Sequence, residues 1–312
     1  MNHTSHGDDS ASAFLDAAHE RILVLDGATG SEYQAIGITE DDLRGDRFAG
    51  HPTSLAGNLD LLVLGRPEVV TDLHRRYLDA GADIITTSTF SSTTIAQREY
   101  GLADPALVHE LNRTAVRLAR DATATAMAVA GRRRFVAGAI GPPNVTLSQS
   151  PTVDDPAHRA ATFRQIAEAY RQQIAGLVGD GGPDGVDVLL VETVFDTLNA
   201  KAAIWAARRH AAETGIHTPI MISGTITDRS GRTLSGQTVG AFWESVRHAN
   251  PITIGLNCAL GGAEMRPHIA ELAREIEQVL AEYIREPLVT VTVDGFVGEY
   301  SEQVRVLGEA AE

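Results

Sequence analysis

Short apolar runs alternate with longer helical patterns along most of this chain. Most of the runs are nearly continuous in Val, Ile, Leu and Ala, which is typical of parallel strands buried on both faces of a sheet. The runs span residues 22–26, 82–90, 134–141, 187–193, 219–225, 252–258 and 287–294. We therefore predict seven strands that are separated by helices.

The stretches between the runs have helical spacing and clear ends. Pro favours the first turn of a helix and Gly the position after its last turn, and such residues bracket several of these stretches. The predicted helices span residues 67–81, 104–131, 155–181, 197–215 and 263–284. In the last of them, Pro267 moves the expected start to near Arg266. Residues 1–12 are predicted to form a disordered tail, and residues 13–312 a single domain.

Strand–helix alternation of this kind leaves two main architectures, the doubly wound open sheet and the (β/α) barrel. No G-x-G-x-x-G follows the first run, so the dinucleotide-binding fold loses its main signal. Polar residues end successive runs, and in a barrel these ends meet on one face around one pocket. The residues are Asp26, Thr87, Glu192, Thr225, Cys258 and Asp294. We therefore predict an α/β fold of the (β/α)₈ TIM-barrel type.

The number of strands is one short of a closed barrel, which needs eight. After Asp294 the remaining residues predict only a loop and one short helix. The predicted barrel is therefore incomplete at the eighth strand, and its open edge would leave backbone hydrogen-bonding groups unpaired. The N-terminal segment, the last helix or a second subunit could cover this edge.

An open edge predicts that the purified chain forms a homo-oligomer or unfolds at an unusually low temperature, because unpaired strand edges readily recruit another chain. Analytical ultracentrifugation and a thermal melt check this expectation. A monodisperse monomer that resists heating would contradict the seven-strand count.

Composition and charge exclude several classes of protein. The chain has 41 acidic and 26 basic side chains and a formal net charge of −15, which disfavours nucleic acid and anionic membranes as partners. The single cysteine rules out an internal disulfide and fits a cytosolic protein. No apolar run has the length of a membrane span, and the first residues lack the order of a signal peptide. We therefore predict a cytoplasmic location.

Two features at the predicted strand ends suggest ligand binding. LDGATGS (25–31) places a carboxylate and two glycines after the first run, where backbone amides could hold an anion such as a substrate carboxylate. Glu192 ends a buried run, and a buried carboxylate is costly unless it binds a partner such as a ligand amine. A plain strand-to-helix turn and a structural partner remain the respective alternatives. The polar loop 224–238 is either a pocket lid or a solvated loop.

Other reactive residue types give weaker signals. A lone cysteine such as Cys258 is more often a small buried hydrophobe than a ligand or a nucleophile. The histidines lack metal-binding spacing, since neither H-x-x-x-H nor H-E-x-x-H occurs. The serines at positions 31, 88 and 223 lie outside any G-x-S-x-G motif, so a hydrolase is not supported.

Several long motifs in a fixed order nevertheless resemble the homocysteine S-methyltransferase family. RILVLDGATGSEYQ is similar to the family's opening D-G-x-x-G-[ST], and IGLNCAL to the segment with its first zinc cysteine. DVLLVETVFDTLNAKAA and PIMISGTITDRSGRTLSGQT are most similar to the N-terminal homocysteine-binding module of cobalamin-dependent methionine synthase. The resemblance spans residues 21–275.

The resemblance implies methyl transfer to the thiol of homocysteine, which gives methionine. It also implies a (β/α)₈ barrel whose C-terminal face binds homocysteine and zinc. Cys258 would be the catalytic residue and a zinc ligand, since zinc coordination turns a thiol into the nucleophilic thiolate. Glu192 would hold the ammonium group of the substrate. The implied substrate-binding residues are Asp26, Gly27, Ala28, Glu192 and Asn257.

This sequence departs from the family pattern at the metal site. The family supplies two further ligands from a Gly-Gly-Cys-Cys motif at the end of the eighth strand, and no such motif occurs here. Thr86 and Ser88 also replace a Glu and an Asn, and Thr29 replaces a Met. Catalytic zinc uses three protein ligands. Two would have to come from His3 and His6, from another chain, or from nowhere.

Two interpretations of the function therefore remain open. The first is an S-methyltransferase, whose donor would be methylcobalamin on a separate corrinoid protein or methionine synthase module, or a small molecule such as S-methylmethionine. The second is a catalytically impaired or truncated homocysteine-binding module without a complete zinc site.

Overall fold

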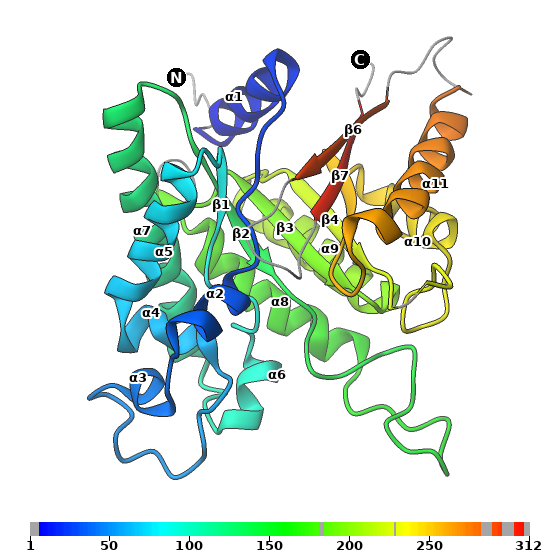
Figure 1. Ribbon diagram of the computed structural model, residues 1–312. Coiled ribbons are helices and arrows are strands. Elements are labelled where there is room, and N and C mark those ends of the chain that lie inside the picture. The colour runs from blue at the N-terminus through cyan, green and yellow to red at the C-terminus, as the bar shows by residue number, and fades with distance from the viewer. Residues whose placement is uncertain (1–5, 181–183, 228, 282–288, 295–302, 309–312) are drawn as a thin grey trace.

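The computed structural model describes residues 6–180, 184–227, 229–281, 289–294 and 303–308. Its centre is a sheet with the strand order β1-β2-β3-β4-β5-β7-β6, and helices lie around it (Figure 1). The strands are β1 (Ile84–Thr86), β2 (Phe135–Ile140), β3 (Val188–Val194), β4 (Ile220–Thr225), β5 (Thr253–Asn257), β6 (Val289–Asp294) and β7 (Gln303–Gly308).

The first five strands pair in parallel and in sequence order, as predicted for a barrel. Each is followed by helical structure before the next strand begins, so their C-terminal ends lie along one edge of the sheet. These five strands form a half-barrel, in agreement with an incomplete TIM-type barrel. The count of eight strands is not reached in the described part of the chain.

The first apolar run takes the place of a strand without forming one. Leu25 makes an isolated parallel bridge with Ile84. The Asp26 amide donates to the Ile84 carbonyl at 2.8 Å, and the Ile84 amide donates to the Val24 carbonyl at 3.0 Å. Residues 22–26 therefore lie beside β1 as an extended segment with few backbone bonds.

The C-terminal part differs from the prediction of a loop and a short helix, which is wrong for Gln303–Gly308. These residues form β7, which pairs antiparallel with β5 and with β6. Valines alternate with polar or charged residues in QVRVLG, a period that suits a strand. β6 consequently runs in the same direction as β5, and it ends at Asp294, whose side chain lies outside the described residues.

Helices cover the sheet, and α5, α7, α8, α9, α10 and α11 pack in sequence order around it (Figure 1). The longer ones are α1 (His6–Glu20), α2 (Thr29–Ile36), α5 (Pro67–Asp79), α7 (Pro105–Ala130), α8 (Phe163–Val178), α9 (Thr197–Thr214), α10 (Val239–Val246) and α11 (Gly262–Ala281). The short ones are α3 (Glu40–Arg44), η1 (Leu59–Leu61), α4 (Leu62–Gly65), α6 (Thr94–Gln97), η2 (Arg98–Tyr100) and η4 (Arg247–Ala249). None of the described helices is long and apolar enough to cross a membrane.

Three predicted boundaries need correction. Residues 6–12 were expected in the tail but open α1, while residues 1–5 lie outside the description. α8 begins at Phe163 and not at 155, because the Thr162 side chain and Gln165 form a capping box at its start. α11 begins at Gly262, before Pro267, since the amide of Met265 already donates to the carbonyl of Gly261.

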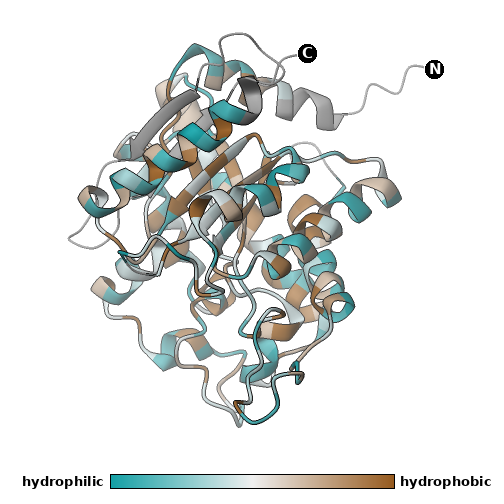
Figure 2. Cartoon of the chain, turned by 90° about the vertical axis from the view of Figure 1, so that its right-hand side faces the viewer, coloured by the Kyte–Doolittle hydropathy of each residue, from teal (hydrophilic) through white to brown (hydrophobic). Residues whose placement is uncertain are grey.

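Two apolar clusters use alternate residues of the strands. Residues such as Ile85, Val136 and Leu189 face the helices, whereas their neighbours face the inside of the half-barrel. The inner cluster consists of Phe14, Leu23, Leu25, Ile84, Phe135, Ala137, Val188, Leu190 and Met221. Phe14 of α1 meets Phe135 edge to face at 5.2 Å, so α1 packs against the inner apolar face. Figure 2 shows hydrophobic residues along the central strands and hydrophilic residues on the outer helix surfaces.

Helix α5 carries a histidine that burial keeps neutral. His74 is 1% exposed, and neither ring nitrogen has a hydrogen-bond partner among the described residues. Burial lowers the pKa of His74 from 6.5 to about 4. The unfolded chain therefore binds a proton between these two values that the folded chain rejects, so stability falls as the pH falls from 6.5 towards 4.

We predict that His74→Leu removes part of this pH dependence. His74 should cost the wild type about 2 kcal/mol between pH 6.5 and pH 5, since one pKa unit corresponds to about 1.4 kcal/mol. Urea unfolding at pH 7.5 and pH 5 measures the difference, with exposed His109→Leu as the control. Equal losses of stability in the wild type and His74→Leu on acidification would contradict the prediction.

Candidate functional site

A cavity with a volume of about 290 Å³ lies at the C-terminal ends of the parallel strands. Its wall includes residues that end the 22–26 segment and strands β1, β3 and β5, together with loops that follow them. The lining residues used below are Asp26, Gly27, Ala28, Tyr33, Asp60, Ser88, Phe90, Ser91, Glu192, Thr193, Asn257 and Cys258.

Asp26 joins the N-terminal segment to β1. It is 3% exposed, and its carboxylate accepts a hydrogen bond from the Thr86 amide at 2.7 Å. The Thr86 hydroxyl donates to the same carboxylate at 3.0 Å. Asp26 therefore faces an amide and a hydroxyl donor on β1. Its position at the cavity wall is therefore fixed by hydrogen bonds with β1.

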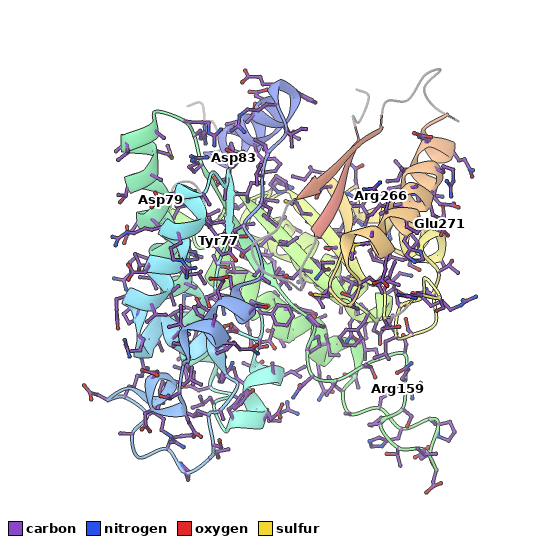
Figure 3. The ribbon with its side chains drawn as sticks, in the orientation of Figure 1. Tyr77, Asp79, Asp83, Arg159, Arg266 and Glu271 are labelled. Carbon is purple, nitrogen blue, oxygen red and sulfur yellow. The ribbon has the colours of Figure 1, made fainter. Side chains whose placement is uncertain are left out.

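Gly27 and Ala28 form the turn between this segment and α2. A Cβ atom at Gly27 would lie 3.0 Å from the Tyr77 hydroxyl, so glycine lets the tyrosine pack closely. The Tyr77 hydroxyl donates to the Ala28 carbonyl at 3.3 Å. Figure 3 shows Tyr77 on α5, near the middle of the molecule. The turn thus leads into α2, whose residues Thr29, Gly30 and Tyr33 also line the cavity.

Asp60 supplies a second buried carboxyl to the cavity. Its Oδ2 atom accepts hydrogen bonds from the Ser91 amide at 2.7 Å and the Ser92 hydroxyl at 2.9 Å. Burial raises the pKa of Asp60 to about 6, although these hydrogen bonds act in the opposite direction. Nearby, the hydroxyls of Tyr33 and Ser88 lie 3.4 Å apart, and burial raises the pKa of Tyr33 to about 12.

Buried amide side chains hold the segment that follows β1. Gln97 donates to the Ser91 carbonyl at 3.2 Å, Asn112 to the Ser92 carbonyl at 2.9 Å, and Gln173 to the Thr89 carbonyl at 2.8 Å. These donors come from α6, α7 and α8. Their bonds fix the segment by its backbone before any ligand binds.

Phe90 lies within this fixed segment and is 39% exposed at the cavity. Its carbonyl accepts the Gly141 amide at 3.1 Å. A Cβ atom at Gly141 would lie 2.4 Å from the Phe90 carbonyl oxygen and 2.8 Å from the ring. Glycine at the end of β2 is therefore needed for the observed position of Phe90.

The ends of β3 and β5 form another part of the wall. Asn257 is 3% exposed, and its Nδ2 atom donates to Thr193 Oγ1 at 2.8 Å and to Cys258 Sγ at 2.9 Å. Its Oδ1 atom accepts from the Ser223 hydroxyl at 2.7 Å and from the Thr193 amide at 3.3 Å. One amide therefore links the ends of three neighbouring strands.

Cys258 follows β5 in a left-handed backbone conformation with φ of 63°. The residue as a whole is exposed at the cavity, while its surroundings still desolvate the thiol. Burial and the negative charge of Glu192 raise the pKa of the Cys258 thiol, against hydrogen bonds that favour the thiolate. The Cys258 thiol is therefore protonated at neutral pH.

The cavity lining carries acidic but no basic side chains. It contains the three carboxyl groups of Asp26, Asp60 and Glu192, and no Lys, Arg or His. Three carboxyl groups at one cavity favour positive charge on a ligand.

The chain matches the sequence model of the homocysteine S-methyltransferase family over residues 23–307. It belongs to that family. The resemblance inferred from the motifs is thereby confirmed, and with it the assignment to a family of methyltransferase enzymes.

Solved structures show the same fold. The metallated form of the homocysteine methyltransferase MmuM from Escherichia coli matches with a TM-score of 0.63 at 20% sequence identity, over 85% of this chain and 83% of that one. The oxidised form matches with a TM-score of 0.58 at 21% identity, over 86% and 81% of the two chains.

The structure brings all six predicted site residues to one cavity: Asp26, Gly27, Ala28, Glu192, Asn257 and Cys258. Thr87 also lines it, whereas Thr225 and the loop 224–238 do not. The sequence reasoning missed Asp60, Tyr33 and Phe90. For Asp60 the available signal was an acidic residue within the apolar stretch NLDLLVL, and this pattern alone could not place Asp60 at the cavity.

The described residues do not fit a zinc site of the family type. They contain no group of three or more His, Cys, Asp and Glu side chains able to hold a metal ion. The sulfur of Cys258 accepts a hydrogen bond from the Asn257 amide at 2.9 Å. His3 and the side chain of His6 lie outside the described residues.

We predict that the purified chain holds well under one zinc per protomer after dialysis, since one thiolate supplies little of the coordination that catalytic zinc requires. Metal analysis by mass spectrometry measures the content of the wild type and of Cys258→Ser. Stoichiometric zinc that survives dialysis would show that other ligands complete the site. Unchanged zinc in Cys258→Ser would show that this cysteine is not a ligand.

Proposed function

We propose that this protein binds homocysteine in the cavity and transfers a methyl group to its thiol, giving methionine. The observation that supports the proposal best is the pairing of Glu192 with the 26–30 turn in one cavity of a family methyltransferase. Glu192 would accept the substrate ammonium group, and the amides at the start of α2 would hold the carboxylate.

In this arrangement the homocysteine thiol would point towards Cys258 and Thr193, which line the cavity next to Glu192. Sulfur would form a bond to the donor methyl group as the bond from methyl to the donor breaks, and the thiol proton would be released. The described side chains orient the substrate and exclude water through Phe90. No step is assigned to a metal, because the described donors do not fit one.

The charge of the cavity favours a small donor that carries its methyl group on a positively charged atom. A sulfonium such as S-methylmethionine meets three carboxyl groups and no cation in the lining. A donor on a separate corrinoid protein, the other candidate, would have to reach the same cavity from outside. Homocysteine with a deuterated methyl donor of either kind distinguishes the two, since only the donor that is used labels methionine.

We predict that Glu192→Gln raises the Kd for homocysteine ten- to a hundredfold, because a charge-assisted hydrogen bond is worth about 1.5–3 kcal/mol. Isothermal titration calorimetry measures the affinity, with exposed Glu277→Gln as the control. The desamino analogue 4-mercaptobutanoate should bind the wild type and Glu192→Gln equally weakly. A full effect of the substitution on that analogue would contradict the assigned role of Glu192.

The absence of a metal-binding group among the described residues favours a second candidate, a homocysteine-binding module without turnover. Calorimetry and methionine formation separate the candidates. Tight homocysteine binding without any labelled methionine, with either donor and with added zinc, would support the binding module. Absence of homocysteine binding would contradict both.

A further inference from the structure

Asn257 is better placed to shape the cavity than to bind a ligand. A primary amide has two N–H donors and two acceptor positions on its oxygen. The structure uses all four, on Thr193, Ser223 and Cys258. Because Asn257 is also 3% exposed, no polar group of its side chain is left to hold a substrate.

The partner that gains most from this amide is Thr193, which has φ of 55°. A β-branched residue in the left-handed region is strained, and such strain persists only where neighbours hold it in place. Asn257 bonds Thr193 at both its amide and its hydroxyl. Thr193 directly follows Glu192 within β3, where the register with β4 shifts between Val191 and Val194, so its conformation helps to set the path of the backbone at Glu192.

The same amide holds Cys258, which also has a positive φ. A single hydrogen bond from Nδ2 to Sγ, 2.9 Å long, places the sulfur beside Thr193. Ser223 on β4 anchors the amide from the other side. Asn257 therefore keeps two neighbouring residues with positive φ, Thr193 and Cys258, in one fixed arrangement at the cavity wall.

We infer that Asn257 is a positioning residue, which acts on the substrate through Thr193, Glu192 and Cys258 and not by direct contact. The inference rests on the proposed binding of homocysteine. It replaces the expectation from the family resemblance that Asn257 binds the substrate itself.

The test first removes the Asn257 side chain and its hydrogen bonds. It then removes the backbone strain at Thr193 that these hydrogen bonds hold in place. Asn257→Ala should raise the Kd for homocysteine at least tenfold, because Thr193 leaves its left-handed conformation. Thr193→Gly alone should weaken binding less than Asn257→Ala does, since glycine adopts a positive φ freely although the threonine side chain is lost from the cavity wall. The double variant Asn257→Ala with Thr193→Gly should regain at least half of the lost affinity on a logarithmic scale.

A direct contact between Asn257 and homocysteine predicts a different result. The double variant would then bind as weakly as Asn257→Ala, because glycine at 193 restores no ligand contact, and this result would overturn the inference. Asn199→Ala is the matched control. Asn199 is also a buried, hydrogen-bonded amide, but it lies on α9 outside the large cavity.

Hydrogen exchange tests the hydrogen bonds between Asn257 and Thr193 without any substrate. Asn257→Ala should speed exchange in the peptide that contains Thr193, whose amide loses its acceptor. Asn257→Asp keeps an oxygen acceptor and should leave that peptide protected while it still weakens homocysteine binding. Unchanged exchange in Asn257→Ala would overturn the inference. If the wild type fails to bind homocysteine while Asn257→Ala still speeds exchange at Thr193, the proposed function alone is contradicted.

Discussion

The site depends on how a nearly unpaired segment is held against β1. Residues 22–26 have one bridge to the sheet, so two buried carboxylates provide most of the remaining attachment. Asp83, at the start of β1, accepts hydrogen bonds from the Val24 amide at 3.0 Å and from Arg21 at 2.6 Å. At the other end, Asp26 accepts the Thr86 amide. Figure 3 places Asp83 beside α1, and it precedes β1 at the end of the strand opposite to Thr86.

These two carboxylates differ in what surrounds them. Asp83 also contacts Arg132 and Arg134, and the charge of the arginines together with the hydrogen bonds lowers its pKa despite burial. It therefore stays ionised and holds the segment at the end remote from the site. Asp26 has hydroxyl and amide donors. The cavity end of the segment is thus held without a neighbouring cation in the described lining, which keeps the cavity negative.

Much of this arrangement follows from patterns in the sequence. Continuous apolar runs predicted the five parallel strands, and polar residues at their ends predicted one cavity, because parallel strands place their C-terminal ends on one edge. β7 was missed because its alternating pattern was taken for a helix in a stretch with no further context. Asp60 was missed for another reason. It follows no strand, and only the path of η1 brings it to the Ser91 amide.

The sequence also identified Cys258 but not the state of its sulfur. The family motif predicts a zinc ligand, whereas the structure gives the sulfur an amide donor and a nearby carboxylate. The short motif around Cys258 is compatible with a zinc ligand and with a hydrogen-bonded thiol, since a zinc site also needs ligands from distant parts of a chain.

Substrate recognition and activation of the substrate thiol therefore have separate requirements. The cavity residues that would recognise homocysteine lie between Asp26 and Cys258, a range that the structure describes almost completely. Activation by a metal would require two more donors, and the chain has no second cysteine to supply one.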